Sequence, residues 1–283
     1  MKRIVVTGAA GQLGTAIVRD FGRRATVVPL TRQDVDLIDG RSVEARIAAE
    51  RPDIVVNCAA FNDVDGAEDR AVEAIGINAG AVRAMARACR AADALLVHYG
   101  TDFVFDGAAS EPYTEADEPS PLNVYGCSKL LGDWFAADAP RHYVLRVESL
   151  FGGEKRRSSI DRIFDALQQG EPARVFVDRT VSPSYVDDVA AVTWRLIETD
   201  APHGLYHCVN TGETTWHALG EEIIRLRGGQ GTLVPVRVAD VKMRARRPQY
   251  AALSNDKLRA AGVDMPTWQD ALRRYLSGRD ASG

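Results

Sequence analysis

The chain begins with an apolar, β-branched run that breaks at a glycine and passes directly into a helical pattern. Ile4-Val5-Val6-Thr7 has the composition of a buried strand, and the apolar residues of Gln12–Val18 recur at helical spacing. The glycines between them, Gly8, Gly11 and Gly14, follow a Gly-x-x-Gly-x-x-Gly pattern. Such a turn lets the backbone approach a pyrophosphate, which the N–H groups of the helix N-terminus then hold. The pattern predicts a dinucleotide site, with an ordinary glycine-rich turn of an α/β protein as the alternative.

Strands and helices alternate through the first half of the chain, which is typical of a doubly wound parallel sheet. The strands expected there are Arg3–Thr7, Thr26–Leu30, Ile54–Asn57, Leu95–Tyr99 and Tyr143–Val147. The expected helices are Gln12–Phe21, Ser42–Glu50, Ala67–Ala91 and Val124–Ala136. We therefore predict an α/β fold with a Rossmann-type doubly wound parallel sheet in residues 1–150.

The alternation loosens in residues 151–283, where we predict a smaller C-terminal substrate-binding α/β domain. Its expected strands are Arg174–Val177, Leu205–Val209 and Thr232–Val236. Its expected helices are Ser159–Gln168, Asp187–Glu198, Trp216–Arg227 and Trp268–Tyr275. The polar tail Ser277–Gly283 is expected to be disordered.

Composition excludes several classes of partner. The net charge of −4 provides no basic field for nucleic acid. No apolar run is long enough to span a bilayer, and the first strand begins too early to leave room for a signal peptide. The four cysteines lie far apart and the five histidines are scattered, so no metal site and no disulfide are expected. We expect a cytoplasmic protein.

A hydroxyl, a phenol and an ammonium follow in the order that hydride chemistry at a carbonyl requires. Thr101 comes just after the fourth expected strand, and Tyr125 precedes Lys129 by one helical turn. A phenol is a poor proton donor near neutral pH, and a nearby ammonium is expected to lower its pKa. Tyr-x-x-x-Lys alone also occurs in ordinary helices, and Thr101 could simply cap a turn.

The choice of cofactor depends on the residues that follow the second strand. An acidic residue there binds the ribose diol of NAD, and a basic residue binds the 2′-phosphate of NADP. Arg32 is suitably placed for the phosphate, while Asp34 and Asp36 could bind a ribose or cap the next helix. NADPH is the expected cofactor, with NADH possible.

Further motifs, in order along nearly the whole chain, resemble the extended short-chain dehydrogenase/reductase family, and within it the sugar-nucleotide reductases. The most specific is Thr101-Asp102-Phe103-Val104-Phe105-Asp106-Gly107. The others are Asn57-Cys58-Ala59-Ala60-Phe61, Pro121-Leu122-Asn123-Val124-Tyr125, Ser182-Pro183-Ser184-Tyr185, Gly204-Leu205-Tyr206-His207 and Arg247-Pro248-Gln249-Tyr250. The resemblance implies reduction of the 4-keto group of a nucleotide-linked 6-deoxy sugar, with dTDP-4-dehydrorhamnose giving dTDP-L-rhamnose as the expected reaction. It also implies that a segment near residues 179–199 returns to the nucleotide domain.

The resemblance assigns roles to individual residues. The catalytic residues are Thr101, Tyr125 and Lys129. The cofactor-binding residues are Gly8, Gly11, Gln12, Leu13, Gly14, Arg32, Asp36, Leu37, Ala59, Ala60, Phe61, Tyr125 and Lys129. The substrate-binding residues are Thr101, Asp102, Ser149, Arg179 and Arg247, with Arg246 as a further candidate for the diphosphate. Asn78 either orders a proton-relay water or bonds locally.

The sequence departs from the family pattern at three places. Gly100 stands where the family has serine, and Ser149 where it has a tryptophan near the sugar, so we expect a roomier hexose pocket. Ala16 replaces the acid through which some members form a metal-bridged dimer, so a monomer or a plain homodimer is expected.

Two other functions share this fold. A dehydratase or epimerase of this type would carry Asp-Glu after the threonine, whereas this chain has Asp102-Phe103. A non-catalytic nucleotide-binding regulatory subunit would not need Thr101, Tyr125 and Lys129 together.

Overall fold

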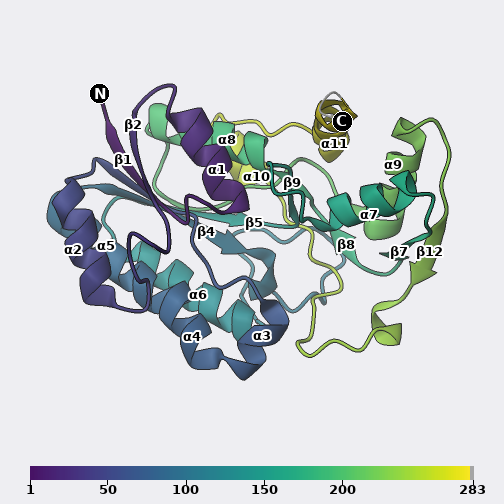
Figure 1. The fold of residues 1–283 in the computed structure, drawn as a ribbon. Coiled ribbons are helices and arrows are strands. Elements are labelled where there is room, and N and C mark those ends of the chain that lie inside the picture. The colour runs from purple at the N-terminus through teal and green to yellow at the C-terminus, as the bar shows by residue number, and fades with distance from the viewer. Residues whose placement is uncertain (281–283) are drawn as a thin grey trace.

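A six-stranded parallel sheet forms the centre of the computed structural model, which describes residues 1–280 (Figure 1). Its strands are β1 (Arg3–Thr7), β2 (Thr26–Leu30), β3 (Ile54–Asn57), β4 (Leu95–Thr101), β5 (His142–Val147) and β10 (Gly204–His207). They lie in the order β10-β5-β4-β3-β1-β2, and every pair is parallel. The predicted doubly wound sheet is confirmed, because the chain adds β2 on one side of β1 and adds β3, β4, β5 and β10 on the other side.

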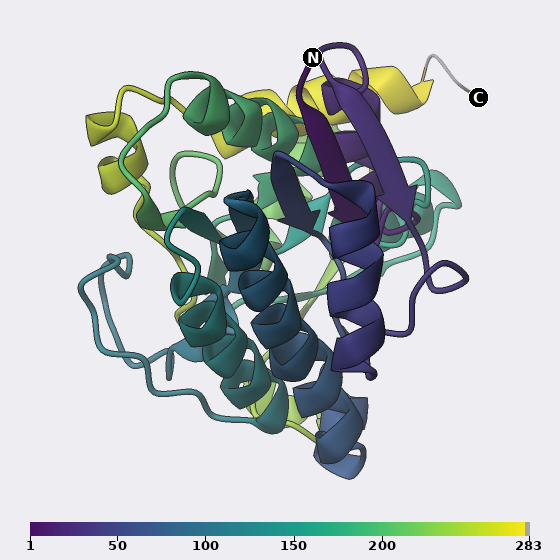
Figure 2. The same cartoon turned by 90° about the vertical axis from the view of Figure 1, so that its left-hand side faces the viewer.

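Helices cover both faces of the sheet. One layer contains α2 (Gly40–Glu50), α5 (Ala81–Ala92) and α6 (Val124–Ala137), which lie side by side in Figure 2. The opposite layer contains α1 (Gln12–Phe21), α8 (Val186–Glu198) and α10 (Asp256–Ala260). Each layer encloses its own apolar core against the sheet. None of the helices within residues 1–280 is both long and apolar enough to cross a membrane.

The helix expected over Ala67–Ala91 is interrupted. The chain forms α3 (Val64–Asp69), α4 (Ala71–Ile75), a π-helical turn at Gly76–Gly80 and then α5. The break follows from Arg70, whose φ of −123° and ψ of 46° leave the helical region. One set of residues at helical spacing is nevertheless buried across the interruption: Ala74, Asn78, Ala81, Met85 and Ala88.

The second half forms a smaller layer with a separate core. It contains α7 (Ser159–Gln168), β7 (Ala173–Phe176), α9 (Trp216–Leu226), β12 (Leu233–Val236) and α11 (Trp268–Asp280). β7 and β12 pair in parallel, and the helices pack around them. Three short strands connect this layer to the sheet side: β6 (Leu150–Phe151), β8 (Thr180–Val181) and β9 (Ser184–Tyr185).

The last helix continues further than expected. The prediction of a disordered tail from Ser277 is wrong as far as Asp280, because Leu276 is buried and Arg279 forms ion pairs with Asp161 and Asp165 on α7. Residues 281–283 of the expected tail lie outside the described residues.

The two halves are interleaved along the chain. After β5 the chain enters the second layer, returns to pack α8 against α1, and adds β10 to the edge of the sheet beside β5. α10 then packs against β10. Segments beyond the expected return near residues 179–199 therefore belong to the sheet as well.

Candidate active site

Thr101 lies at the carboxyl end of β4, in the crevice where open parallel sheets bind ligands. β4 is two residues longer than expected, so Gly100 and Thr101 belong to the strand. The Thr101 hydroxyl donates to Oδ1 of Asp102 at 3.1 Å and accepts from the backbone N–H of Phe103 at 3.3 Å. Thr101 and Asp102 are both buried. Burial raises the pKa of Asp102 to about 6, against the opposing effect of Arg179.

Tyr125 is the second residue of α6 and lies next to Thr101. The Asn123 side chain caps this helix by accepting from the N–H of Gly126 at 2.7 Å, which fixes where Tyr125 begins the first turn. The Tyr125 ring packs edge-on against Phe103, with 5.4 Å between the ring centroids. The Thr101 hydroxyl lies close enough to the phenol to act on its pKa, which it lowers. The structure thus brings together the two hydroxyls that the sequence placed 24 residues apart.

Lys129 lies one turn further along α6 and is buried. Its Nζ donates to the carbonyl of Tyr99 at 2.5 Å. Burial lowers the pKa of Lys129 to about 8, and the Asp133 carboxylate acts in the opposite direction.

The expectation that Lys129 lowers the pKa of Tyr125 is wrong for this structure. Burial raises the pKa of the Tyr125 phenol, the negative charge of Asp102 raises it further, and the Thr101 hydroxyl opposes them. The phenol consequently keeps its proton at neutral pH.

The glycine-rich turn has the geometry that a pyrophosphate requires. Gly8 has a φ of 64°, and a Cβ on Gly14 would lie 2.2 Å from the Gly8 carbonyl oxygen. The ten-residue helix α1 begins after Gly11 without a side-chain cap, so its first N–H groups face the turn. Leu13 packs in the core below, and the Gln12 side chain donates to the carbonyl of Gly152 at 2.9 Å. The turn fits a dinucleotide.

The end of β2 favours a 2′-phosphate over a ribose diol. Asp34 accepts from the N–H and the hydroxyl of Thr31, and Asp36 accepts from the N–H of Ile38 at 3.0 Å, so both carboxylates stabilise local turns. Arg32 is exposed and has no partner within residues 1–280. Leu37 packs beside the α2 and α5 core.

The expectation that Asn78 bonds locally is wrong, because its partners are distant in the sequence. Its Oδ1 accepts from the N–H of Phe61 at 2.8 Å, and its Nδ2 donates to the Phe61 carbonyl at 3.2 Å and to the Ser128 hydroxyl at 2.9 Å. These bonds tie the π-helical turn to α6 and to the segment after β3. Ala59, Ala60 and Phe61 are in that segment, at the carboxyl edge of the sheet.

Gly100 does not face the reacting centre, so the expectation that it makes the hexose pocket roomier is wrong. A Cβ there would lie 2.7 Å from Oδ1 of Asp133 and 2.9 Å from Cγ of Arg146. These two residues form a buried ion pair, with Arg146 Nε 3.0 Å from Asp133 Oδ2. Successive residues of a strand point to opposite faces, so Thr101 faces the crevice and Gly100 faces this ion pair.

The three basic candidates differ in their surroundings. Arg247 pairs with Asp65 at 2.9 Å and donates to the Ala245 carbonyl, and Arg246 is exposed. Arg179 donates through Nε to the Pro248 carbonyl at 3.2 Å, and its positive charge acts on the buried acids Asp102 and Glu148. Its guanidinium also lies 5.7 Å from the Phe103 ring centroid.

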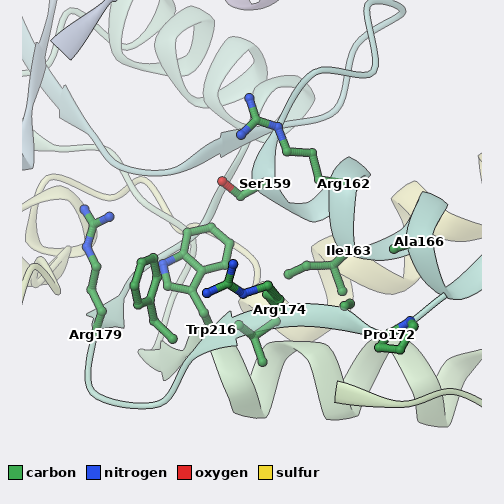
Figure 3. Close-up of a pocket in the computed structure, with 11 residues that line it drawn as sticks. Ser159, Arg162, Ile163, Ala166, Pro172, Arg174, Arg179 and Trp216 are labelled. Atoms are coloured by element: carbon green, nitrogen blue, oxygen red, sulfur yellow. The ribbon is translucent and has the colours of Figure 1, made fainter. Parts of the chain in front are cut away.

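A cavity of about 280 Å³ opens beside Arg179 in the second layer. Arg162 of α7, Arg174 of β7, Arg179 and Trp216 line it, and Figure 3 shows Arg174 beside the Trp216 indole. Sequence reasoning missed Arg162, Arg174 and Trp216. Arg174 could have been found, because it alternates with the buried Ala173 and Val175 along β7 and must therefore face outward.

Two further expectations concern Ser149 and metals. Ser149 is half-buried between β5 and β6, with a φ of 43°. Across residues 1–280 no three or more His, Cys, Asp or Glu side chains are arranged to hold a metal ion.

Comparison with known proteins connects this geometry to a family. The family model described as the RmlD substrate binding domain matches residues 1–280. A dTDP-4-dehydrorhamnose reductase from Streptomyces griseus is 35% identical over 280 residues, which cover 95% of this chain and 91% of the relative. The crystal structure of dTDP-4-dehydrorhamnose reductase from Bacillus anthracis in complex with NADP is 30% identical, with a TM-score of 0.93 over 98% of this chain and 99% of that chain. The UDP-glucose 4-epimerase from Thermus thermophilus, 20% identical over 99% of this chain and 100% of that chain with a TM-score of 0.83, shares the fold.

Proposed function

Because this chain belongs to the RmlD substrate binding domain family within the extended short-chain dehydrogenases/reductases, we propose that it reduces the 4-keto group of dTDP-4-dehydrorhamnose to give dTDP-L-rhamnose. It is an NADPH-dependent sugar-nucleotide oxidoreductase. The observation that supports the reaction most directly is the placement of Thr101 at the carboxyl end of β4 beside Tyr125 in the first turn of α6, close enough for the Thr101 hydroxyl to act on the pKa of the phenol.

Each residue of the site has a separate role in the reduction of the carbonyl. NADPH, when bound, supplies the hydride to the carbonyl carbon. The Thr101 and Tyr125 hydroxyls polarise the keto oxygen by hydrogen bonding, and Tyr125 gives its proton to that oxygen to complete the alcohol. The raised pKa of Tyr125 keeps the phenol protonated until negative charge develops on the oxygen. Lys129, held against the Tyr99 carbonyl, is positioned behind the phenol to bond the nicotinamide ribose.

The remaining assigned residues bind the cofactor and the sugar nucleotide away from the reacting atoms. Gly8, Gly11, Gln12, Leu13 and Gly14 provide the pyrophosphate turn. Arg32, Asp36 and Leu37 surround the adenosine, and Ala59, Ala60 and Phe61 line the cofactor after β3. Asp102, Ser149 and Arg179 contact the sugar nucleotide, and the structural role of Arg247 against Asp65 makes it the weakest of these assignments.

The cavity beside Arg179 is the place we assign to the nucleotide. Its three guanidinium groups can neutralise a diphosphate, and the Trp216 ring can stack on a base. In this arrangement the substrate-binding part is residues 151–283 without the segments that return to the sheet. The rest of the chain binds the cofactor. We place the enzyme in the cytoplasm, as a monomer or homodimer, in keeping with its four unpaired cysteines.

Arg174→Ala should weaken the binding of dTDP roughly tenfold, because it removes one charged partner of the diphosphate. Calorimetric titration with dTDP and separately with NADPH measures the change, and NADPH affinity should stay constant. Arg195→Ala is the matched control, since Arg195 is exposed on α8 outside the cavity and pairs with Glu198. If Arg174→Ala bound dTDP as tightly as the wild type does, the assignment of the nucleotide to this cavity would be wrong.

Arg32→Ala should raise KM for NADPH roughly tenfold and leave KM for NADH little changed, because only NADPH carries the 2′-phosphate. The two constants are measured at saturating sugar nucleotide. Arg23→Ala, an exposed arginine after α1, serves as the control. A parallel rise for both cofactors would show that Arg32 supports the fold instead.

The deciding experiment follows NADPH oxidation with dTDP-4-dehydrorhamnose and identifies the product by mass and chromatography. Consumption of one NADPH for each dTDP-L-rhamnose formed is the expected result. NADPH binding without oxidation of any 4-keto sugar nucleotide would favour the regulatory subunit, and conversion without net NADPH use would favour an epimerase.

A further inference from the structure

Glu148 is a buried acid that the reaction described above does not use. It directly follows β5, and its exposed fraction is 1%. One carboxyl oxygen, Oε2, accepts from the N–H of Ser182 at 2.5 Å. The other oxygen, Oε1, is enclosed and has no hydrogen-bond partner among residues 1–280. A buried polar atom without a partner costs free energy, so its retention needs an explanation, and a bound ligand is one.

Glu148 leaves the sheet at the same edge as the catalytic hydroxyls. β4 and β5 pair in parallel with Thr101 opposite Val147, so Glu148 is the first residue beyond that pair. The charge of Asp102 acts on Glu148, and so does the charge of Arg179. Arg179 lines the nucleotide cavity, whereas Asp102 accepts from the catalytic Thr101. Glu148 therefore neighbours both the reacting end and the nucleotide end of the site, where the hexose must lie.

Burial and the charges around Glu148 favour its protonated form. Burial is the main cause that raises the pKa of Glu148, and the Asp102 and Glu213 carboxylates raise it further. Arg179 opposes them but is shared with Asp102, and the Tyr250 hydroxyl donates to Glu213. One guanidinium is thus shared between two buried acids, which leaves the pKa of Glu148 well above its ordinary value. Because Oε2 accepts from Ser182, the proton of a neutral Glu148 belongs on Oε1, which is then a free donor.

We propose that Glu148 recognises the hexose of the substrate through a hydrogen bond between its free carboxyl oxygen Oε1 and a hydroxyl oxygen of the sugar. The inference rests on the proposed function, since it takes the sugar nucleotide as the ligand. A site with a buried polar group of this kind discriminates against a ligand that leaves the group unpaired. Glu148 is accordingly a specificity residue that contacts the sugar, alongside the hydroxyls that act on the carbonyl.

The test compares binding of dTDP-L-rhamnose with binding of dTDP alone, because only the first ligand carries the hexose. Glu148→Leu, which removes the hydrogen bond at similar volume, should weaken binding of dTDP-L-rhamnose by a factor on the order of 10 to 100 and leave dTDP and NADPH affinities unchanged. Glu148→Gln keeps a neutral donor and should recover most of the loss. All three ligands are titrated calorimetrically against each variant.

A pH series provides a readout that does not depend on the folding of the leucine variant. The wild-type ratio of the two affinities, dTDP-L-rhamnose over dTDP, should fall as the pH rises through the raised pKa of Glu148, where the carboxyl loses its proton. The same ratio in Glu148→Gln should stay flat, since an amide does not titrate in this range. Asp102 and Arg179 are present in both proteins, so a pH dependence confined to the wild type requires the Glu148 carboxyl.

The outcomes separate this proposal from the proposed function. Equal loss of dTDP and dTDP-L-rhamnose affinity in Glu148→Leu, no loss at all, or parallel pH dependence in the wild type and Glu148→Gln would overturn the role of Glu148 while wild-type NADPH oxidation continued. Failure of the wild type to oxidise NADPH with any 4-keto sugar nucleotide would overturn the reductase and the Glu148 assignment with it.

Discussion

Tyr125→Phe is expected to lower kcat by a factor on the order of 10² to 10⁴, the usual contribution of one positioned proton donor. The variant keeps the ring that packs against Phe103 but removes the hydroxyl group beside Thr101. NADPH affinity should stay near the wild-type value, because the substitution leaves Lys129 on the Tyr99 carbonyl. Single-turnover measurements of NADPH oxidation isolate the chemical step.

Tyr206→Phe is the matched control for this loss. Tyr206 is also a buried tyrosine, and its hydroxyl donates to the Pro202 carbonyl at 2.6 Å, in the core and not in the crevice. Its removal should leave the single-turnover rate unchanged. A Tyr125→Phe variant with the wild-type single-turnover rate would show that another group protonates the sugar oxygen.

Gly100→Ser is expected to lower the free energy of unfolding by about 3 kcal/mol or more, although it restores the residue typical of the family. The new Cβ would meet the Asp133 carboxylate at 2.7 Å and push it away from Arg146, inside a buried ion pair. Separating such a pair leaves uncompensated charge in the core. Denaturant unfolding followed by fluorescence and circular dichroism measures the change.

Gly40→Ala is the control for the Gly100 prediction, because a Cβ at Gly40 would meet its nearest neighbour, Ala84, at an ordinary 3.5 Å. Its stability should stay close to that of the wild type. If Gly100→Ser were as stable as Gly40→Ala and also changed KM for the sugar nucleotide, position 100 would face the hexose after all.

The sheet was predictable because its strands are short apolar runs bounded by turns. Every strand expected in the first half is present, and β4 differs only by its extension through Gly100 and Thr101. The interruption at Arg70 and the π-helical turn were not predictable, since the helical periodicity continues through them and tertiary bonds from Asn78 hold the irregular backbone.

The residues of the site were predictable where a sequence motif fixes their spacing. Their pKa values and burial were not, because these depend on tertiary contacts. Thr101, Tyr125 and Lys129 come together as their order along the chain implied. The pKa of Tyr125 nevertheless moves in the opposite direction to the one expected, because burial and the Asp102 charge raise it. No local pattern marks Glu148, whose burial depends on Ser182 and Arg179 from distant segments. Likewise, no local pattern shows that a side chain at position 100 would meet Asp133 of α6.

The return of α8 and β10 to the sheet has a consequence for recombination between members of the family. A fragment that ended after β5 would leave one edge of the sheet unpaired at Tyr143–Arg146 and would uncover the apolar face that α1 shares with α8. A single junction after β5 therefore cannot transplant the sugar-binding part as a module. A working chimera needs crossovers on both sides of α8 and β10, so that each parent contributes its own complete sheet.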